Sequence, residues 1–152
     1  MPETVLVSAC LLGLNTRYDG NHNCCEALLE YLQQADLIAI PICPEQLAGL
    51  PTPRPKVWFT KGDGAAILEG QGRMVDETGR NMGAAFLHGA EMCLQIARCN
   101  QSKMAILKQH SPSCGCRSIH RSGETVPGMG VTAALLGKHN IKMMSEEDFT
   151  TD

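Results

Sequence analysis

Four short apolar segments, separated by sequence with helical character, constrain the fold of this chain most strongly. They cover residues 4–10, 36–43, 103–109 and 141–146. Strands that are apolar on both faces are typical of parallel sheets, because helices cover both sides of such sheets. The sequence therefore predicts an α/β fold: a single three-layer domain over residues 1–152, with a mostly parallel sheet of about four strands flanked by helices.

Three helices are predicted between these strands. Asn23 and Glu26 have the spacing of a capping box, and an apolar stripe of leucines follows them. Apolar residues recur at helical spacing through 82–98. A short third helix is predicted over 131–136, and Gly137 is expected to end it, since glycine accepts the left-handed closing conformation.

Residues 47–80 form the least regular part of the sequence. This stretch holds several prolines and glycines and is too long for an ordinary loop. We expect it to be an irregular excursion that carries some strand, at 56–60 and at 72–75, and that covers or flanks a site.

Charge and composition exclude several classes of protein. The chain of 152 residues has a net charge of −3 and only 4 % aromatic residues, which disfavours a nucleic-acid binder. No apolar run approaches the roughly 18 residues of a membrane helix, and no signal-peptide core is visible. We therefore expect a cytoplasmic protein without a membrane partner. In that reducing compartment its eight cysteines serve as thiols, metal ligands or catalytic groups rather than as disulfides.

Three cysteines follow the ends of predicted strands. Cys10 ends the first strand, Cys43 ends the second, and Cys114 lies a few residues beyond the third. Parallel strands end at one edge of their sheet, and ligand sites form in the crevice outside that edge. We therefore expect these three side chains to meet in space.

Three thiolates suit a soft metal centre. A [4Fe–4S] cluster normally takes four cysteines, so three would leave one iron open, and an open position distinguishes a catalytic metal site from a structural one. The spacing alone does not choose between iron–sulfur and zinc. A buried thiol is also a common small core residue, which is the alternative for each cysteine taken singly.

Residues beside the cysteines add acid–base chemistry. Glu45 follows Cys43 by two positions and could move protons near a metal, although a solvated loop carboxylate is the plainer interpretation. The segment 111–115 supplies hydroxyls and a glycine beside Cys114, or forms a simple turn. Arg54 and Lys56 could bind an anionic group, and a surface position is the default for both.

The sequence gives weaker indications of a functional role for the remaining cysteines. Cys93 and Cys25 fall on apolar helical stripes and are expected in the core, whereas Cys24 is expected to be exposed and Cys99 is unassigned. Cys116 follows Cys114 by two positions, and a fourth ligand, a sulfur relay and a bystander all remain open for it.

Taken in order, the motifs of this chain resemble those of the thiouracil desulfidase family. The resemblance runs from residue 5 to about 146 and rests on V-S-A-C-L-L-G (7–13), R-Y-D-G (17–20), C-P-E (43–45), G-L-P-T-P-R (49–54), A-I-L-K (105–108), S-P-S-C-G (111–115) and G-V-T-A-A-L-L (130–136). The tail of S-P-S-C-G departs from the family pattern at Cys116 and His120, as does the stretch around Lys56. These departures concern the cover of the site and the choice of substrate.

The resemblance implies a [4Fe–4S] cluster held by Cys10, Cys43 and Cys114. It also implies acid–base roles for Glu45 and for a serine of the 111–115 segment, where Ser111 is preferred to Ser113.

We accordingly expect a small thiolated nucleobase as substrate. The reaction would convert 2-thiouracil to uracil and hydrosulfide without net redox change, with sulfur taken up by the open iron. Such an enzyme is a hydrolase or lyase acting on a carbon–sulfur bond. A sulfur-transfer protein and a zinc-binding structural module are the alternatives. The sequence does not predict an oligomeric state.

Overall fold

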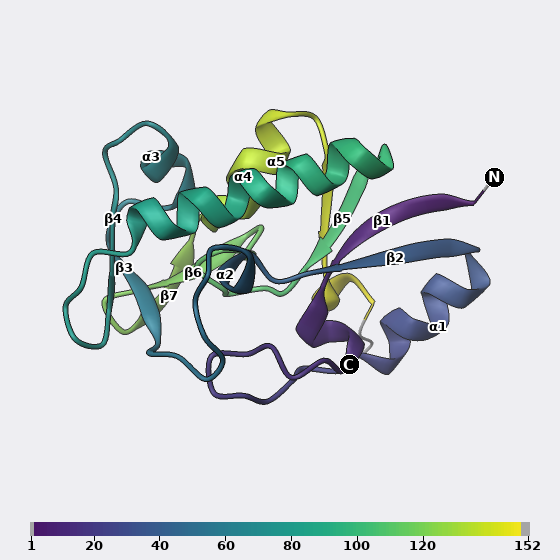
Figure 1. Ribbon diagram of the computed structural model, residues 1–152, viewed down its shortest axis with the longest axis horizontal. Coiled ribbons are helices and arrows are strands. Elements are labelled where there is room, and N and C mark those ends of the chain that lie inside the picture. Colours follow the sequence, from purple (N-terminus) through teal and green to yellow (C-terminus); the bar gives the residue numbers. More distant parts are fainter. Residues whose placement is uncertain (1, 150–152) are drawn as a thin grey trace.

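The first sheet of the computed structural model, which describes residues 2–149, is the one the sequence predicts (Figure 1). Its strand order is β2-β1-β5-β8, and every neighbouring pair is parallel. The four strands are β1 (Glu3–Ser8), β2 (Leu37–Ile42), β5 (Met104–Leu107) and β8 (Lys142–Ser145). The predicted parallel sheet of four strands is confirmed.

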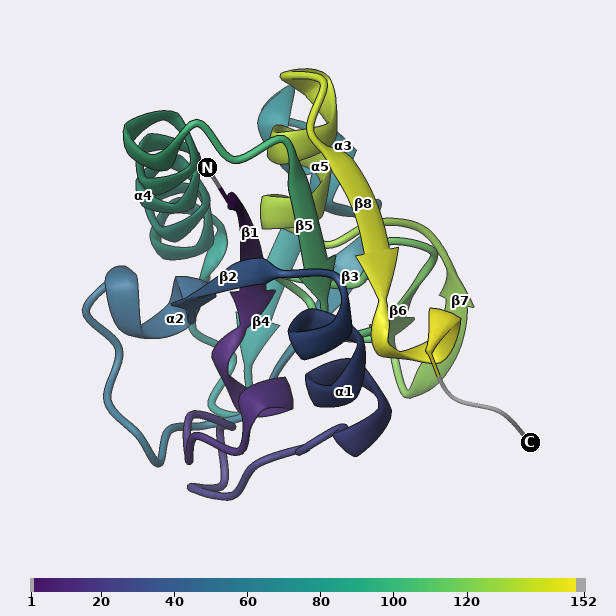
Figure 2. The same ribbon diagram turned by 90° about the vertical axis from the view of Figure 1, so that its right-hand side faces the viewer.

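Helices cover both faces of this sheet. Successive side chains of a strand point to opposite faces, so Leu6 packs toward α4 and α5, whereas Val5 and Val7 pack toward α1. Figure 2 shows α1 and α4 on opposite sides of the strands. The helices are α1 (Glu26–Gln34), α4 (Gly83–Asn100) and α5 (Val131–Lys138). The predicted helical layers are therefore confirmed.

A second, mixed sheet of order β4-β3-β6-β7 was only half predicted. Two of its strands are the ones expected in the irregular stretch, β3 (Val57–Lys61) and β4 (Arg73–Asp76). The other two form a hairpin, β6 (Ser118–Arg121) and β7 (Glu124–Pro127), that the sequence analysis missed. Its two-residue turn, Ser122 and Gly123, has positive φ at both positions, as a tight hairpin requires. Glycine in this turn was the available signal.

Helix α4 joins the two sheets because it packs on both of them. Its C-terminal half packs Cys93, Leu94 and Ala97 on the first sheet, and its N-terminal half packs Phe86 and Ala90 on the second. Two further short helices complete the elements: α2 (Pro44–Leu47) after β2, and α3 (Gly64–Leu68) between β3 and β4. The two sheets therefore lie along one helix, as Figure 1 shows.

Two glycines allow the close contacts that place the site. A Cβ on Gly89 of α4 would collide with the carbonyl of Pro44, so glycine lets α2 lie against α4. A Cβ on Gly130, just before α5, would collide with the backbone of Ser113 and Cys114. Both contacts hold a cysteine-bearing segment against a helix.

Two expectations about helix ends were wrong. Asn23 does not cap α1, which begins at Glu26 after Cys25 and has no side-chain cap; the Asn23 amide oxygen is instead bonded by an arginine. Gly137 lies inside α5, which continues to Lys138. The residue with left-handed backbone after this helix is Asn140, with φ of 65°. The chain therefore turns at Asn140 and not at Gly137.

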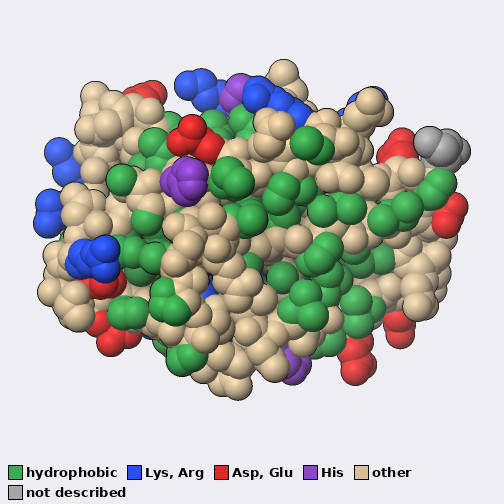
Figure 3. All heavy atoms as spheres, viewed as in Figure 1, with side chains coloured by type: hydrophobic (Ala, Val, Ile, Leu, Met, Phe, Trp, Pro, Cys, Tyr) green, Lys and Arg blue, Asp and Glu red, His purple; other side chains and the backbone are tan. Residues whose placement is uncertain are grey.

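The exterior over α4 and β2 carries few charges. Exposed large hydrophobic residues include Ile38 on the edge strand β2, at 48 %, and Met92 on α4, at 39 %. In Figure 3 hydrophobic side chains gather across the middle of this face, and many of the charged ones lie toward its rim. Among residues 2–149, no helix has the length and apolar character needed to cross a membrane.

Candidate functional site

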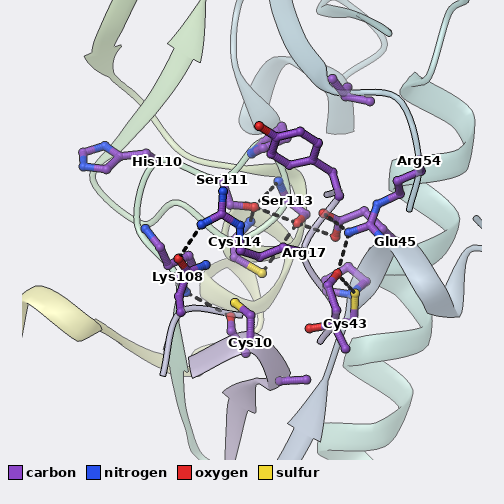
Figure 4. Close-up of a pocket in the computed structure, with 18 of the residues that line it drawn as sticks. Cys10, Arg17, Cys43, Glu45, Arg54, Lys108, His110, Ser111, Ser113 and Cys114 are labelled. Carbon is purple, nitrogen blue, oxygen red and sulfur yellow. Dashed lines mark hydrogen bonds and ion pairs between the residues drawn. The ribbon is translucent and has the colours of Figure 1, made fainter. Parts of the chain in front are cut away.

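All six candidate residues of the sequence analysis line one cavity of about 310 Å³. The cavity lies beyond the carboxyl ends of β1, β2 and β5, the edge at which parallel sheets form their ligand sites. Figure 4 shows the sulfurs of its three cysteines directed toward a common space, with the Glu45 carboxylate beside it. The residues concerned are Cys10, Cys43, Glu45, Ser111, Ser113 and Cys114.

Each of the three cysteines lies in a different segment of the chain. Cys10 lies in a short 3₁₀ helix (Ala9–Leu12) that follows β1, and Cys43 is the residue before α2. Cys114 lies in the loop after β5, which is tied to the start of α5 because Thr132 N donates to Ser113 O at 2.8 Å. This bond uses a free amide of the α5 N-terminus. The amides of α5 therefore support the loop that carries Cys114.

Polar groups lie beside the three cysteines. The Asn23 side chain favours the thiolate of Cys10, and backbone N–H groups at the start of α2 favour that of Cys43. The Cys43 thiol also donates to Thr16 O at 3.8 Å, and the Ser113 hydroxyl lies 3.5 Å from the Cys114 sulfur. Donors of this kind stabilise thiolates and tune the metals that thiolates bind.

Burial nevertheless opposes the charged form of these thiols. Desolvation raises the pKa of Cys10 and of Cys43, and it raises the pKa of the fully buried Cys114 furthest. Three thiolates packed together in this cavity would also repel one another. A positively charged centre bound between them removes both penalties, because metal binding replaces the protons.

A chain of hydrogen bonds connects the carboxylate to both serines. Ser113 Oγ donates to Glu45 Oε1 at 2.8 Å, and Ser111 Oγ lies 3.0 Å from Ser113 Oγ. Ser111 Oγ also accepts from the backbone N–H groups of Ser113 and Cys114, at 3.2 and 3.1 Å. Glu45 is therefore not a solvated loop carboxylate, and the 111–115 segment is more than a simple turn.

Arg54 belongs to the site, so the default surface interpretation was wrong for it. Its side chain is only 6 % exposed and lies 3.7 Å from Glu45 Oε2. It also donates to Thr16 O at 2.8 Å, which anchors the loop opposite Glu45. The proline-rich stretch folds Arg54 inward, where the carboxylate and carbonyl compensate its charge. Lys56 is exposed, as expected, and it also lines the cavity.

Several lining residues were missed by the sequence analysis. Ser8 and Asn23 contact the cysteines, and Lys108 enters the cavity with its ammonium 2.8 Å from Glu146. Arg17, at the start of R-Y-D-G, lines the cavity too. Ser8 and Lys108 immediately follow or end strands, so position at the same sheet edge was the signal that could have found them.

The other cysteines lie outside the cavity lining. Cys93 and Cys25 are buried in the core as expected, and Cys24 is exposed as expected; Cys99 is exposed as well. Cys116 is partly buried, and the Gln109 amide donates to it at 3.7 Å. Within the described part of the chain, no group of three or more His, Cys, Asp or Glu residues is arranged to hold a single metal ion.

Comparison with known proteins now decides the family. The family model for 2-thiouracil desulfurase matches residues 5–148. The chain belongs to the 2-thiouracil desulfurase family. That match spans every cysteine, carboxylate and serine of the cavity described above, and the resemblance found in the sequence motifs is confirmed.

Two individual proteins are similar to this chain over nearly its whole length. The uncharacterized protein YbbK of Bacillus subtilis (strain 168) is 35 % identical over 147 residues, 95 % of this chain and 96 % of YbbK. A solved structure described as a [4Fe–4S]-dependent thiouracil desulfidase, TudS, is 36 % identical and superimposes with a TM-score of 0.79. It matches 96 % of this chain and 92 % of its own, so the fold is shared over nearly the whole length.

Proposed function

We propose that this chain is a [4Fe–4S]-dependent desulfidase that removes sulfur from a small thiolated pyrimidine such as 2-thiouracil. The reaction consumes water and yields the oxo base and hydrosulfide, without an external electron donor. The observation that carries this proposal is the convergence of three cysteine sulfurs, a carboxylate and two hydroxyls on one cavity. Family membership and the cluster dependence of TudS support it.

The donor set fits such a cluster. Cys10, Cys43 and Cys114 offer thiols, and among the described residues no group of three or more His, Cys, Asp or Glu is arranged for a single ion. Three thiolates would leave one iron without a protein ligand. Polar groups that favour the thiolate form lie beside each cysteine, as expected around cluster ligands.

The cluster, when bound, would supply a Lewis-acidic iron for the soft thiocarbonyl sulfur. Glu45 is the residue placed to take a proton from water, and Arg54 keeps its carboxylate oriented toward the cavity. Ser113 donates its one hydroxyl proton to Glu45, so its oxygen accepts from the Ser111 hydroxyl. A proton taken by Glu45 can therefore pass along the hydroxyls to the ring or to the departing sulfur.

Ser111 is the serine we assign to the substrate side. It is only partly buried, whereas Ser113 is fully buried beneath it and is bonded to Glu45. In this arrangement Ser113 connects the carboxylate to the hydroxyl that meets the substrate.

The alternative functions fit the site less well. A structural zinc module would not need a carboxylate joined to two hydroxyls at the cavity, and the described residues do not gather around a single ion. A sulfur-transfer protein acting on a large acceptor such as tRNA would be expected to carry a basic face, and this chain has a net charge of −3.

We further propose that residues 1–152 act as one catalytic unit in a reducing cytoplasm. Helix α4 contributes side chains to the hydrophobic clusters of both sheets, so a single helix joins them. The eight cysteines of the chain are all free, as thiols are in that compartment.

The decisive experiment is anaerobic reconstitution with iron and sulfide, followed by iron and sulfide counting and an assay with 2-thiouracil. We expect four irons per chain, a broad absorption band near ~400 nm, and uracil and hydrosulfide formed in equal amounts without added reductant. Turnover that consumed a reductant in step with product would contradict the non-redox assignment.

A second arm separates the alternatives. The same protein loaded with zinc should be colourless and inactive, whereas equal activity of the zinc form would contradict cluster dependence. Measured binding of tRNA by the loaded protein, with sulfur passing to it, would instead support the sulfur-transfer function.

A further inference from the structure

Lys108 lines the cavity but has no part in the acid–base chemistry of Glu45 and the serines. It directly follows β5, and its backbone N–H donates to Ser8 Oγ at 2.9 Å, so the end of β1 fixes its backbone. Cys10 lies two residues beyond Ser8. The topology therefore places a lysine at the same edge of the sheet as the first cysteine, and Figure 4 shows both on the same side of the cavity.

Two acceptors hold the ammonium of Lys108. Its Nζ lies 2.8 Å from Glu146 Oε2 and donates to Gln109 O at 2.9 Å. Glu146 begins the short 3₁₀ helix that follows β8 (Glu146–Asp148), and its other oxygen accepts from Gln109 N at 2.7 Å. Both carboxylate oxygens are therefore bonded, which fixes a side chain that is only 14 % exposed. Glu146 does not line the cavity, so it holds the ammonium from outside it.

One donor of this ammonium is left over. A lysine ammonium carries three N–H groups, and the bonds to Glu146 and Gln109 use two of them. Across residues 2–149, no further acceptor is bonded to it. The Lys108 side chain is 25 % exposed and lines the cavity, so its third N–H is available to a molecule bound there.

The arginines of the cavity have other partners. Arg54 pairs with Glu45, and Arg17 pairs with Asp19 of its own loop. In Figure 4 Arg54 and Glu45 lie together on one side of the cavity, and Lys108 lies on the opposite side. A ring whose thiocarbonyl carbon meets a water held by Glu45 therefore has Lys108 at its far edge.

The chemistry of the proposed substrate gives the third N–H a use. In 2-thiouracil one ring nitrogen lies between the thiocarbonyl and an oxo group and shares its lone pair with both. A cation bonded to the oxo oxygen draws this lone pair toward the oxo group, so the thiocarbonyl carbon becomes more electrophilic and water attacks it more easily. Such a cation lowers the barrier most when it is held in place before the substrate binds, as Glu146 holds Lys108.

We propose that Lys108 is a substrate-binding and catalytic residue that donates its third N–H to the oxo group of the thiolated pyrimidine, and that Glu146 is the positioning residue that orients it. The inference rests on the proposed function, because it requires a thiolated pyrimidine in the cavity. It narrows the substrate class to pyrimidines in which one ring nitrogen separates the thiocarbonyl from an oxo group. Pyrimidine-2-thione lacks that oxo group and cannot make the contact.

The test compares Lys108→Met and Lys108→Arg with wild-type protein after reconstitution. Methionine keeps much of the side-chain length and removes the charge. With 2-thiouracil we expect kcat/KM to fall about 10–100-fold in Lys108→Met, as for loss of a hydrogen bond to a charged group, and to recover in part in Lys108→Arg. With pyrimidine-2-thione both variants should match wild type. Lys103→Met makes the same change at an exposed position just before β5 and should be silent.

Binding gives a readout that needs no turnover, and it decides the matter if pyrimidine-2-thione is not turned over. Calorimetry should show weaker binding of uracil by Lys108→Met, with unchanged binding of pyrimidin-2-one, whose only oxo group replaces the thiocarbonyl. An equal loss for both members of either pair would show a general effect of the charge and overturn the contact. Wild-type kinetics of Lys108→Met with 2-thiouracil would also overturn it.

A double-mutant cycle tests Glu146. Glu146→Gln keeps an oxygen for the Gln109 N–H but offers no charge to Lys108. It should lower kcat/KM for 2-thiouracil by less than Lys108→Met does, and it should add no further loss in the Lys108→Met background. Equal losses in both backgrounds would show that Glu146 acts only on the fold and would overturn its positioning role.

Failure of the two proposals can be told apart. If wild-type protein binds the cluster and turns over 2-thiouracil while Lys108→Met matches it, only the present inference fails. If wild-type protein takes up no iron after reconstitution, or turns over no thiolated pyrimidine, the proposed function fails and the inference falls with it. Iron counting and circular dichroism of each variant exclude loss of cluster or of fold as the cause of a lower rate.

Discussion

The hydroxyl of Ser113 donates a hydrogen bond of 2.8 Å to the carboxylate of Glu45, from a position 68 residues further along the chain. The two residues come from different segments, Glu45 from the first turn of α2 and Ser113 from the loop before β6. Glu45 follows Cys43 by two positions, and Ser113 directly precedes Cys114. This bond therefore joins acid–base chemistry to the proposed cluster site, and it motivates the first three predictions.

Replacing Glu45 by glutamine should leave cluster binding intact and lower turnover by about 10²–10⁴-fold, since a positioned proton acceptor is lost. Iron counting and thiouracil turnover measure the two effects separately. Glu91→Gln makes the same change on an exposed position of α4 and should be silent. Full activity of Glu45→Gln would show that the Glu45 carboxylate takes no part in proton transfer.

The two serines should differ in their effects. Ser113→Ala breaks the bond to Glu45, so we expect turnover to fall with little loss of stability beyond about 1 kcal/mol. Ser111→Ala also leaves the N–H groups of Ser113 and Cys114 without their acceptor, so turnover and stability should both fall. Urea unfolding and turnover assays on both variants check this. Normal turnover in Ser111→Ala would show that no hydroxyl is needed on the substrate side.

Arg54→Met should lower turnover because it releases the Glu45 carboxylate and the loop at Thr16 together. It should also destabilise the protein, by about 1–3 kcal/mol, since it leaves largely buried polar groups without a partner. Arg54→Lys keeps the charge but not the forked donor geometry, so it should recover part of the activity. Steady-state kinetics of both variants, with Arg73→Met as a control at an exposed position outside the cavity, provide the measurement.

Serine in place of Cys10, Cys43 or Cys114 should abolish cluster binding, because an alkoxide is a harder and more basic ligand than a thiolate.

Cys116→Ser should keep close to four irons and most of the turnover, because Cys116 does not line the cavity. Cys93→Ser should keep the cluster and cost about 1–3 kcal/mol, since a buried core thiol becomes a hydroxyl. Iron analysis of proteins prepared without oxygen decides between these groups. Equal iron loss in all five variants would contradict the three-cysteine assignment.

Asp76 should make folding stability depend on pH in a way unrelated to the site. Bonds from Thr78 Oγ1 and from the backbone N–H groups of Thr78 and Arg80 lower the pKa of this carboxyl below its ordinary value of 3.8. Because the pKa is lower in the folded state, the ionised carboxylate stabilises the fold at pH values above the unfolded-state pKa. This stabilisation is lost as the pH falls through the folded-state pKa. The urea midpoints of wild type and Asp76→Asn should therefore converge below about pH 4. A difference that stayed constant with pH would rule this out.

The sequence by itself determined the parallel sheet, its helical layers and the meeting of three cysteines. These features follow from local rules: apolar segments of strand length form buried strands, and parallel strands end at the same edge. Cys10, Cys43 and Cys114 were therefore placed correctly without knowledge of the strand order. The motif resemblance independently named the family to which the chain belongs.

Only the tertiary structure decided how the side chains around those cysteines pair. Arg54 turns inward because Glu45 and the Thr16 carbonyl compensate its charge. Asn23 does not cap α1, because its side chain is bonded by Arg17 and its backbone N–H by the Cys10 carbonyl. The β6–β7 hairpin likewise forms where β3 offers a free edge. Each of these outcomes depends on partners that are distant in sequence or lie outside any regular period, and hydrophobic periodicity carries no information about such pairs.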